Sequence, residues 1–274
     1  MASKTTDQEE PKKEKDKRMA AKSESNGQGT VAPVHLMLQS KGGVGKTTCC
    51  AFLAQYLIDE GKTIVLLDMD PRNASLSKYK GLPVEQLDVF EEGNIDPMKT
   101  NQFFGRLIEQ DLDKTVVVDT GATTFEAMVD FLIKQDVVEE FWKAGRPLYL
   151  HTVVCSGASS IETLSTFVSL SESVTRRQNL VVWVNEIGEH VQFSGKTLVE
   201  TKGFQANQER VAATVLIECS DRIAPLAMNA MLKGRMTFKE AKDSKDVQAL
   251  PFFSRQRLGK MRDEIYGQLR KSSL

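Results

Sequence analysis

Eight residues near the start of the chain, KGGVGKTT at positions 41–48, restrict its possible folds more than any other feature. An apolar stretch at 34–38 with a strand pattern precedes them, and an amphipathic helical pattern at 47–60 follows. Backbone N–H groups in such a loop can surround phosphate oxygens only where side chains do not intervene, and the following helix adds its positive N-terminal end. The order of strand, glycine-rich loop and helix therefore predicts a phosphate-binding loop.

The residues of this loop have distinct expected roles. Lys46 is expected to reach the β- and γ-phosphates of a nucleotide and the Thr47 hydroxyl to ligate Mg²⁺, while Thr48 can contact the α-phosphate. The general motif G-x-x-x-x-G-K-[ST] is not met strictly, because Ser40 stands at its first position and is followed by Lys41. The pattern K-G-G-x-G-K-[ST] marks the deviant Walker A class of ATPases. The predicted nucleotide contacts in the loop are Gly42, Gly43, Val44, Gly45, Lys46, Thr47 and Thr48.

Acidic residues follow two of the predicted strands. Asp119 ends the apolar run at 115–118, and a carboxylate at that strand end can hold Mg²⁺ through its water shell, as a Walker B residue does. Asp68 and Asp70 follow the strand pattern at 64–67 and are expected in the same crevice, at the carboxyl ends of a parallel sheet. Asp70 is the candidate for positioning the attacking water.

The remaining pattern predicts one α/β domain over residues 31–274. Apolar, β-branched runs are typical of parallel strands covered on both faces, and they lie at 63–68, 115–119, 147–154, 180–184 and 213–217. Helical patterns separate them, at 101–110, 124–134, 159–173, 222–232 and 256–270. This alternation predicts a mostly parallel, doubly wound P-loop NTPase sheet with helices on both faces.

Residues 1–30 differ from the rest of the chain in composition. They contain seven Lys or Arg and six Asp or Glu but no Val, Leu, Ile or aromatic residue. Such a segment cannot offset the entropy lost on ordering, so a disordered, charged tail is expected. No apolar run in the chain approaches the roughly 20 residues that cross a bilayer, and no secretory signal is evident, so a cytoplasmic protein without stable membrane anchoring is expected.

Net charge and cysteine content limit other classes of function. A net charge of −1 does not suggest a dedicated nucleic-acid binder, although it leaves a local basic patch open. The four cysteines show no paired metal-ligand spacing and are expected to be reduced thiols; they are Cys49, Cys50, Cys155 and Cys219. An iron protein of the nitrogenase type would need cluster-binding cysteines between Cys50 and Cys155, where the sequence has none.

The segments KGGVGKTT, DMDPRNAS and VVVDTGATT together resemble the ParA/MinD family of dimerising ATPases, and the resemblance covers most of residues 33–270. Further segments, LHTVVCSGASSIETLSTF, VVWVN and SRQRL, are similar to ParA-like proteins of plasmid conjugal transfer and are not part of the general partition-ATPase pattern. The resemblance implies a slow, partner-stimulated ATPase that uses ATP and Mg²⁺, forms an ATP-dependent homodimer and acts with conjugative transfer machinery or relaxosome proteins.

The same resemblance implies roles for single residues. Lys41 would cross the dimer interface to the partner's phosphates, so it joins Lys46 and Asp70 as a catalytic candidate. Thr47 and Asp119 would hold the Mg²⁺ ion, and an asparagine after the strand pattern at 181–184 would contact adenine. That asparagine is Asn185.

Two departures from the family pattern concern the switch regions. Partition ATPases continue the second strand as DxDPQGN, whereas this chain has Arg72 and Asn73 after the proline. The Walker B aspartate is followed by Thr120, Gly121 and Ala122 instead of a proline pair.

Three alternatives to the transfer ATPase remain open on sequence alone. A partition ATPase that binds DNA non-specifically would need a basic strip, for which the candidates are Arg176 with Arg177, Lys233 with Arg235, and Arg255 with Arg257. A membrane switch would use the apolar stripe within 258–269, although such a stripe more often docks on its own domain. An adaptor gated by ATP would turn over too slowly for hydrolysis to matter.

Overall fold

The computed structural model describes residues 1, 31–70, 73–92, 94–218, 223–246, 248, 250–272 and 274. The tail expected at 1–30, apart from its first residue, lies outside the described residues, and so do Arg72 and Cys219. The architecture below is that of Val31–Leu274, one of the two units into which the chain divides.

A parallel sheet forms the centre of this unit. Within the described residues it has seven strands in the order β3-β2-β6-β1-β7-β8-β9, and every neighbouring pair is parallel. The strands are β1 Val34–Met37, β2 Ile64–Asp68, β3 Val84–Gln86, β6 Thr115–Asp119, β7 Leu148–Cys155, β8 Leu180–Glu186 and β9 Val211–Glu218. The predicted strands are thus confirmed. β3 and the two-residue strands β4 Phe90–Glu91 and β5 Asn94–Ile95 are too short to produce a periodic pattern.

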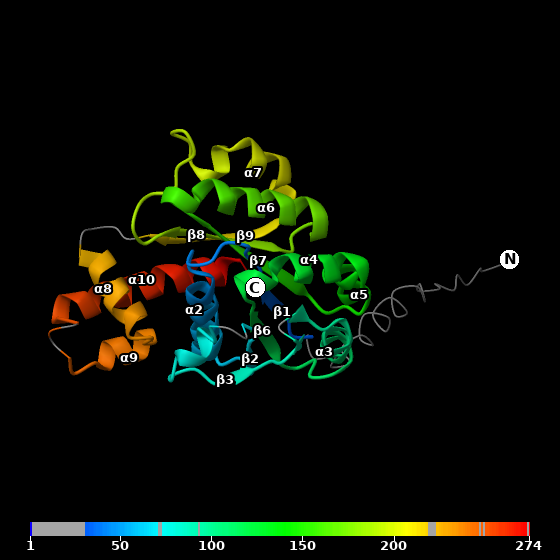
Figure 1. Ribbon diagram of the computed structural model, residues 1–274, viewed down its shortest axis with the longest axis horizontal. Coiled ribbons are helices and arrows are strands. Elements are labelled where there is room, and N and C mark those ends of the chain that lie inside the picture. Colours follow the sequence, from blue (N-terminus) through cyan, green and yellow to red (C-terminus); the bar gives the residue numbers. More distant parts are fainter. Residues whose placement is uncertain are drawn as a thin grey trace. The chain divides into compact units, whose positions relative to one another are not determined.

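Helices cover both faces of the sheet (Figure 1). They are α2 Lys46–Asp59, α3 Pro97–Glu109, α4 Phe125–Lys134, α5 Val137–Lys143, α6 Ser160–Val174, α7 Lys202–Asn207, α8 Ile223–Lys233, α9 Phe238–Asp243 and α10 Phe252–Lys271. One apolar core joins the sheet to α2, α8, α9 and α10, and a second joins its other face to α3 through α7. The doubly wound arrangement is therefore confirmed, while the short helices α5, α7 and α9 were not predicted.

Helix α2 carries the phosphate-binding loop and is held on all sides. It begins directly after Gly45, whose φ of 104° lies in the left-handed region, and it ends before Gly61, with φ of 74°. All residues from Thr48 to Leu57 are buried. Cys49 and Cys50 are fully buried thiols, as expected, and burial raises the pKa of both well above the ordinary value. A helix buried all round is fixed relative to the sheet, so the loop that precedes it is fixed too.

The apolar stripe of α10 docks on its own domain, as the sequence favoured. Leu258, Met261, Ile265, Tyr266 and Leu269 are each at most 4% exposed. None of the helices in the described part of the chain is both long enough and apolar enough to cross a membrane.

Three buried rings form a polar chain across the centre of the sheet. Trp183 Nε1 donates to His151 Nδ1 over 3.0 Å, and His151 Nε2 lies 2.9 Å from His35 Nδ1. Because His151 Nδ1 accepts, its proton is on Nε2, which donates to His35. Both imidazoles are neutral: burial lowers the pKa of His35 to about 3 and that of His151 well below its ordinary value.

Acidification is expected to destabilise the fold through these two histidines. Below about pH 6.5 the unfolded chain binds a proton on each imidazole, whereas the folded chain leaves His35 neutral until about pH 3. The unfolded state then binds more protons, so the free energy of unfolding falls by up to about 1.4 kcal/mol per pH unit for each histidine. Urea unfolding between about pH 7 and pH 5 measures this slope.

The matched variant for this measurement is His151→Gln. Glutamine can still accept from Trp183 and donate to His35, but it does not titrate. The pH slope is expected to become shallower in this variant, and an unchanged slope would contradict the assignment.

Candidate nucleotide-binding site

A cavity of about 410 Å³ opens where the loop between β1 and α2 meets the turns after β2 and β6. These turns lie at the carboxyl ends of parallel strands, where ligands bind in open α/β sheets. The lining residues are Lys41, Gly42, Gly43, Gly45, Lys46, Thr47, Thr48, Asp70, Asn73, Ser75, Ala122, Thr123 and Arg235. The structure thus brings most of the predicted loop residues, together with Asp70, to one cavity.

Glycine is required at position 45 for two reasons. Its φ of 104° is strained for any other residue, and an added Cβ would meet Asn185 Nδ2 at 2.7 Å. Asn185 Nδ2 donates to Val44 O over 2.9 Å, and Asn185 Oδ1 accepts from Ile187 N over 3.2 Å. Asn185 therefore ties the end of β8 to the phosphate loop. Neither Asn185 nor Val44 lines the cavity itself.

Lys46 and Thr47, at the end of the loop, form a cluster with the buried Asp119. Lys46 Nζ donates to Thr120 O and lies 3.6 Å from Asp119 Oδ1, while Thr47 Oγ1 donates to Asp119 Oδ2 over 2.7 Å. Asp119 is only 1% exposed. Burial raises the pKa of Asp119, and Lys46 and the Thr47 hydroxyl act against that rise.

The same cluster fits a magnesium–nucleotide complex. Asp119 Oδ1 is buried and has no hydrogen-bond partner among the residues that the structure describes. A carboxylate oxygen next to a threonine hydroxyl offers the hard oxygen ligands that Mg²⁺ prefers, and Mg²⁺ in nucleotide sites is bound by one or two protein groups together with phosphates. Lys46 and Thr47 line the cavity directly above this carboxylate.

The two acids after β2 have different functions in the structure. Asp68 is fully buried; its Oδ1 accepts from Asp70 N over 3.0 Å and its Oδ2 accepts from Ser77 N and Oγ over 2.9 and 3.0 Å. Asp68 therefore holds the turn. Asp70 lines the cavity, and its two oxygens accept from Asn73 N and Nδ2, each over 3.1 Å.

The unusual residues after Asp119 have a structural reason. Thr120 Oγ1 donates to Met37 O over 2.6 Å, which joins the ends of β6 and β1. A Cβ added to Gly121 would lie 3.3 Å from the Asp70 carboxyl carbon, so glycine leaves room for Asp70 beside the turn. The turns after β2 and β6 are therefore in close contact, although neither follows the common family sequence.

Lys41 points toward helix α6 in this state. Its Nζ pairs with Glu162 Oε2 over 2.7 Å, and both side chains are substantially exposed. An exposed ion pair of this kind contributes about 0–1 kcal/mol. Lys41 can therefore leave Glu162 at little cost.

Five lining residues were not predicted from the sequence: Asn73, Ser75, Ala122, Thr123 and Arg235. Asn73 follows the acidic turn closely enough that the motif could have indicated it. Arg235 comes from the loop between α8 and α9, and no sequence pattern connects it with the phosphate loop.

The basic strip considered from the sequence does not form from its three candidate pairs. Arg176 and Arg177 precede β8, at the amino ends of the strands, and they pair with Glu139 and Glu209. Arg235 lines the nucleotide cavity at the opposite, carboxyl ends.

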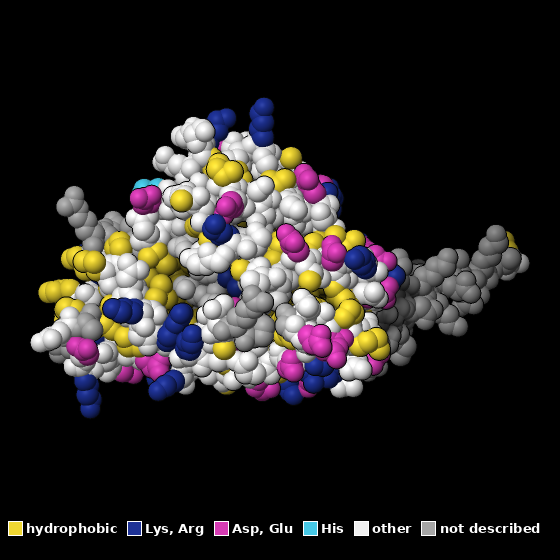
Figure 2. All heavy atoms as spheres, viewed as in Figure 1, with side chains coloured by type: hydrophobic (Ala, Val, Ile, Leu, Met, Phe, Trp, Pro, Cys, Tyr) yellow, Lys and Arg dark blue, Asp and Glu magenta, His cyan; other side chains and the backbone are white. Residues whose placement is uncertain are grey.

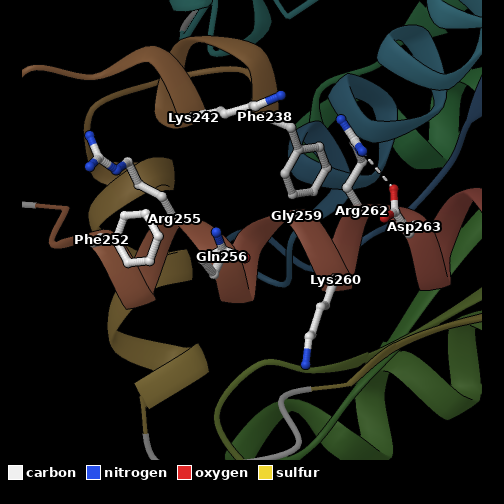
Figure 3. A pocket seen from close by; sticks show the side chains of 9 residues that line it. All are labelled: Phe238, Lys242, Phe252, Arg255, Gln256, Gly259, Lys260, Arg262 and Asp263. Carbon is white, nitrogen blue, oxygen red and sulfur yellow. Dashed lines mark hydrogen bonds and ion pairs between the residues drawn. The ribbon is translucent and has the colours of Figure 1, made fainter.

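Arg255 instead lies in a separate cationic cavity. This cavity, of about 430 Å³, lies between α9 and α10 (Figure 3). It is lined by Phe238, Lys242, Phe252, Arg255, Gln256, Gly259, Lys260, Arg262 and Asp263. Figure 2 shows hydrophobic and basic side chains together over this part of the molecule.

Comparisons with known proteins show the family of this chain. The family model CbiA, described as the CobQ/CobB/MinD/ParA nucleotide binding domain, matches residues 36–272. Two proteins called Protein TraL from Escherichia coli are each 32% identical to this chain, over 87% and 89% of it and over 98% and 100% of their own lengths. A solved ParA family ATPase from Chlorobium tepidum TLS covers 85% of this chain and 98% of its own, with 14% identity and a TM-score of 0.49.

The resemblance to the ParA/MinD family that the sequence motifs indicated is thereby confirmed. The nucleotide-binding model begins within β1 and ends one residue after α10, so it includes the phosphate loop, the turns after β2 and β6, and most of the sheet that carries them. The chain belongs to the CobQ/CobB/MinD/ParA nucleotide-binding domain family, and the TraL proteins are its relatives within that family.

Proposed function

We propose that this protein is a Mg-ATP-binding and ATP-hydrolysing dimerisation switch that acts in plasmid conjugative DNA transfer. The observation that supports this most is the cavity lined by the glycine-rich loop, Lys46, Thr47 and Asp70. Buried Asp119 accepts from Thr47 and lies 3.6 Å from Lys46 Nζ. Phosphoryl transfer needs little covalent chemistry from a protein, so a site that positions phosphates, a metal ion and water is sufficient.

Each group has a place in this proposal. The loop N–H groups and Lys46 bind the phosphates, while the Thr47 hydroxyl and Asp119 hold the Mg²⁺ ion, Asp119 through water. Bound Mg²⁺ neutralises charge on the phosphate oxygens. Asn185 contacts the adenine base, and Lys41 leaves Glu162 to reach the phosphates bound by a second protomer.

Asp70 orients the water that attacks the γ-phosphate. Both of its oxygens accept hydrogen bonds from Asn73, and each oxygen keeps a second lone pair that can accept from water. Asn73 therefore fixes the carboxylate in place and leaves it able to orient water. Turnover is slow and stimulated by a partner, as the resemblance to the ParA/MinD family implies.

The transfer setting rests on the similarity to the TraL proteins, which extends along their whole length. The segments LHTVVCSGASSIETLSTF, VVWVN and SRQRL, which are similar to ParA-like proteins of conjugal transfer, form β7 with α6, most of β8, and the first turns of α10. The proposed partners are a second copy of the chain and proteins of the transfer machinery or relaxosome. An ATP-driven switch of this kind acts in the cytoplasm.

Loss of the protein is expected to reduce plasmid transfer while plasmid inheritance stays intact. The gene is deleted from the plasmid and supplied in trans as wild type, as Lys46→Ala, or as Lys62→Ala, which removes an exposed lysine just after the same helix. Wild type and Lys62→Ala are expected to restore transfer, and Lys46→Ala is not. Normal transfer with failing inheritance would replace this proposal with a partition function.

A second candidate function, contact with DNA by a partition-type ATPase, is favoured by the cationic cavity. Four basic residues line it, and its one acidic lining residue, Asp263, pairs with Arg262 (Figure 3); the basic residues are Lys242, Arg255, Lys260 and Arg262. Phosphate contacts of this kind weaken steeply with salt. In the same assays Lys260→Glu distinguishes the candidates. If wild type binds DNA in a salt-sensitive way and the Lys260→Glu variant loses plasmid inheritance, the partition function is favoured.

The Asp70→Ala variant in the transfer assay distinguishes an ATP-gated adaptor from a switch that needs hydrolysis. If this variant binds ATP, does not hydrolyse it and still supports normal transfer, then hydrolysis is dispensable and ATP acts only as a gate.

A further inference from the structure

Arg235 lines the nucleotide cavity although it lies far along the chain from the phosphate loop. The two lysines of that cavity have acidic partners: Lys41 pairs with Glu162, and Lys46 lies 3.6 Å from Asp119. Arg235 has no carboxylate within ion-pair distance in the described part of the chain. Its guanidinium carbon instead lies 5.7 Å from the centre of the Tyr79 ring. Among the described residues it is thus a cation at the cavity wall without an ion-pair partner.

The backbone holds Arg235 in a conformation that non-glycine residues seldom adopt. Its φ is 51°, in the left-handed region. Gly234 N donates to Ala230 O and Met236 N to Met231 O, so the turn after α8 is fixed on both sides of Arg235. Together with Arg235 N donating to Leu232 O, these bonds form a left-handed cap of the kind that ends many helices, so the end of α8 fixes where the Arg235 side chain begins.

The segment that follows Arg235 is attached to the helix that carries the phosphate loop. Phe238 N donates to Gln55 Oε1 of α2 over 2.7 Å, and the Phe238 ring stacks on Phe52 with centroids 4.9 Å apart. Thr237 and Glu240 form a capping box that starts α9. Because α2 begins at the phosphate loop, these contacts fix the position of Arg235 relative to the loop.

Tyr79 indicates which part of the nucleotide Arg235 faces. The Tyr79 ring is almost completely buried, and Arg235 lies over it. Burial raises the pKa of Tyr79, and nearby Arg235 and Thr48 oppose that rise, so both lie close to the Tyr79 hydroxyl. Arg235 and Thr48 thus both line the cavity beside Tyr79, and Thr48 is where the α-phosphate is expected.

We propose that Arg235 binds the α- and β-phosphates of the nucleotide held by its own protomer. This inference rests on the proposed function, because it takes the ligand of the cavity to be ATP. A guanidinium can donate two parallel hydrogen bonds to phosphate oxygens, which a lysine cannot reproduce. The α- and β-phosphates are present in both ATP and ADP, so Arg235 strengthens the binding of both nucleotides equally.

A contact that is equally strong before and during the chemical step lowers KM and leaves kcat unchanged. Arg235 should in this respect differ from Lys41 and Asp70, whose proposed contacts act on the γ-phosphate. The ratio of KM and kcat effects therefore distinguishes a residue that binds the nucleotide from one that takes part in hydrolysis.

The test is calorimetric binding of Mg-ATP and Mg-ADP to the full chain as wild type, Arg235→Ala, Arg235→Lys and Lys233→Ala. Arg235→Ala is expected to raise Kd for both nucleotides by about 10- to 100-fold, the usual range for one lost charged hydrogen-bond partner. Its KM for ATP should rise similarly while kcat changes less than about twofold. Arg235→Lys should recover part of the affinity. Lys233→Ala removes an exposed charge two residues earlier and should bind as wild type does.

Each other outcome overturns the inference in its own way. Unchanged affinity in Arg235→Ala, with wild type binding normally, shows that Arg235 does not contact the nucleotide and leaves the proposed function standing. A weakened ATP affinity with unchanged ADP affinity assigns Arg235 to the γ-phosphate instead. If wild type binds neither nucleotide, the proposed function fails and the inference with it. Should Arg235→Ala not fold, as judged by its circular dichroism and melting temperature, Arg235→Gln is measured against the same expectations.

Discussion

Replacing Lys46 with alanine is expected to abolish measurable Mg-ATP binding. The Lys46 side chain is 10% exposed and lines the cavity directly above Asp119. In the proposed complex its ammonium group carries the main positive charge that the protomer itself offers to the β- and γ-phosphates. Truncating one partner of a desolvated charge pair costs about 2–5 kcal/mol or more, which corresponds to at least about a 30-fold loss of affinity.

The variant also removes the cation that faces Asp119. Burial already raises the pKa of Asp119, and the loss of Lys46 should raise it further. An Asp119 that binds a proton more readily is a weaker ligand for Mg²⁺, so the loss of Mg-ATP affinity should exceed that from one missing contact.

Calorimetry with Mg-ATP measures this effect, and Lys62→Ala is the matched control. Lys62 is exposed just beyond the other end of α2, so this variant removes the same charge without touching the cavity. Folding is checked by circular dichroism for both variants. Wild-type affinity in a folded Lys46→Ala would show that the loop does not bind phosphate.

The fold could be predicted well where apolar patterns were long. β1, β2, β6, β7 and β8 are continuous buried runs, and burial on both faces of a parallel sheet leaves that signature in the sequence. β3 and the antiparallel pair β4–β5 have two or three residues each, too few to show a period. The α10 boundary was placed at Gln256 instead of Phe252, because Phe252 and Phe253 are exposed and fall outside the buried stripe.

The site could be predicted only as far as local motifs reach. The phosphate loop, Asp70 and Asp119 each sit within a few residues of a strand end, so strand pattern and residue type were enough to find them. Arg235 approaches the same cavity through tertiary packing of α9 against α2, and one sequence contains no sign of that contact. Asn185 was expected to contact adenine, whereas its visible bond holds Val44 O, a backbone atom that no side-chain motif records.

Lys41→Ala and Asp70→Ala are expected to fail at different steps of the proposed cycle. Both residues line the cavity, but Lys41 is partly exposed and pairs with Glu162, whereas Asp70 is 7% exposed and accepts from Asn73. A mobile cation near the cavity mouth suits contact with a second protomer's phosphates. A fixed carboxylate inside the cavity suits orientation of water.

For Lys41→Ala the expected result is normal ATP binding with neither tight dimerisation nor hydrolysis. The γ-phosphoryl group spreads negative charge as it transfers, and a cation from the partner would stabilise that charge. Loss of the exposed pair with Glu162 should leave the fold intact, since such pairs contribute about 0–1 kcal/mol. Glu162→Gln is the matched control: it breaks the same pair but keeps the lysine charge, and it should dimerise at least as well as wild type.

Asp70→Ala should instead retain ATP and accumulate as a dimer. The lost carboxylate contributes no attraction to the triphosphate, and its removal relieves repulsion with the phosphates. ATP binding and dimer association should therefore persist. The rate of hydrolysis should fall by the factor of about 10²–10⁴ that is typical of a lost general base or orienting group. Light scattering with Mg-ATP measures association, and phosphate release measures turnover, for wild type and for the Lys41→Ala, Glu162→Gln and Asp70→Ala variants. Because the two assays are independent, the roles of the two residues can be separated. An Asp70→Ala variant that binds ATP but stays monomeric would contradict the water-orienting role of Asp70. A Lys41→Ala variant that hydrolyses ATP normally would contradict the role of the partner lysine in hydrolysis.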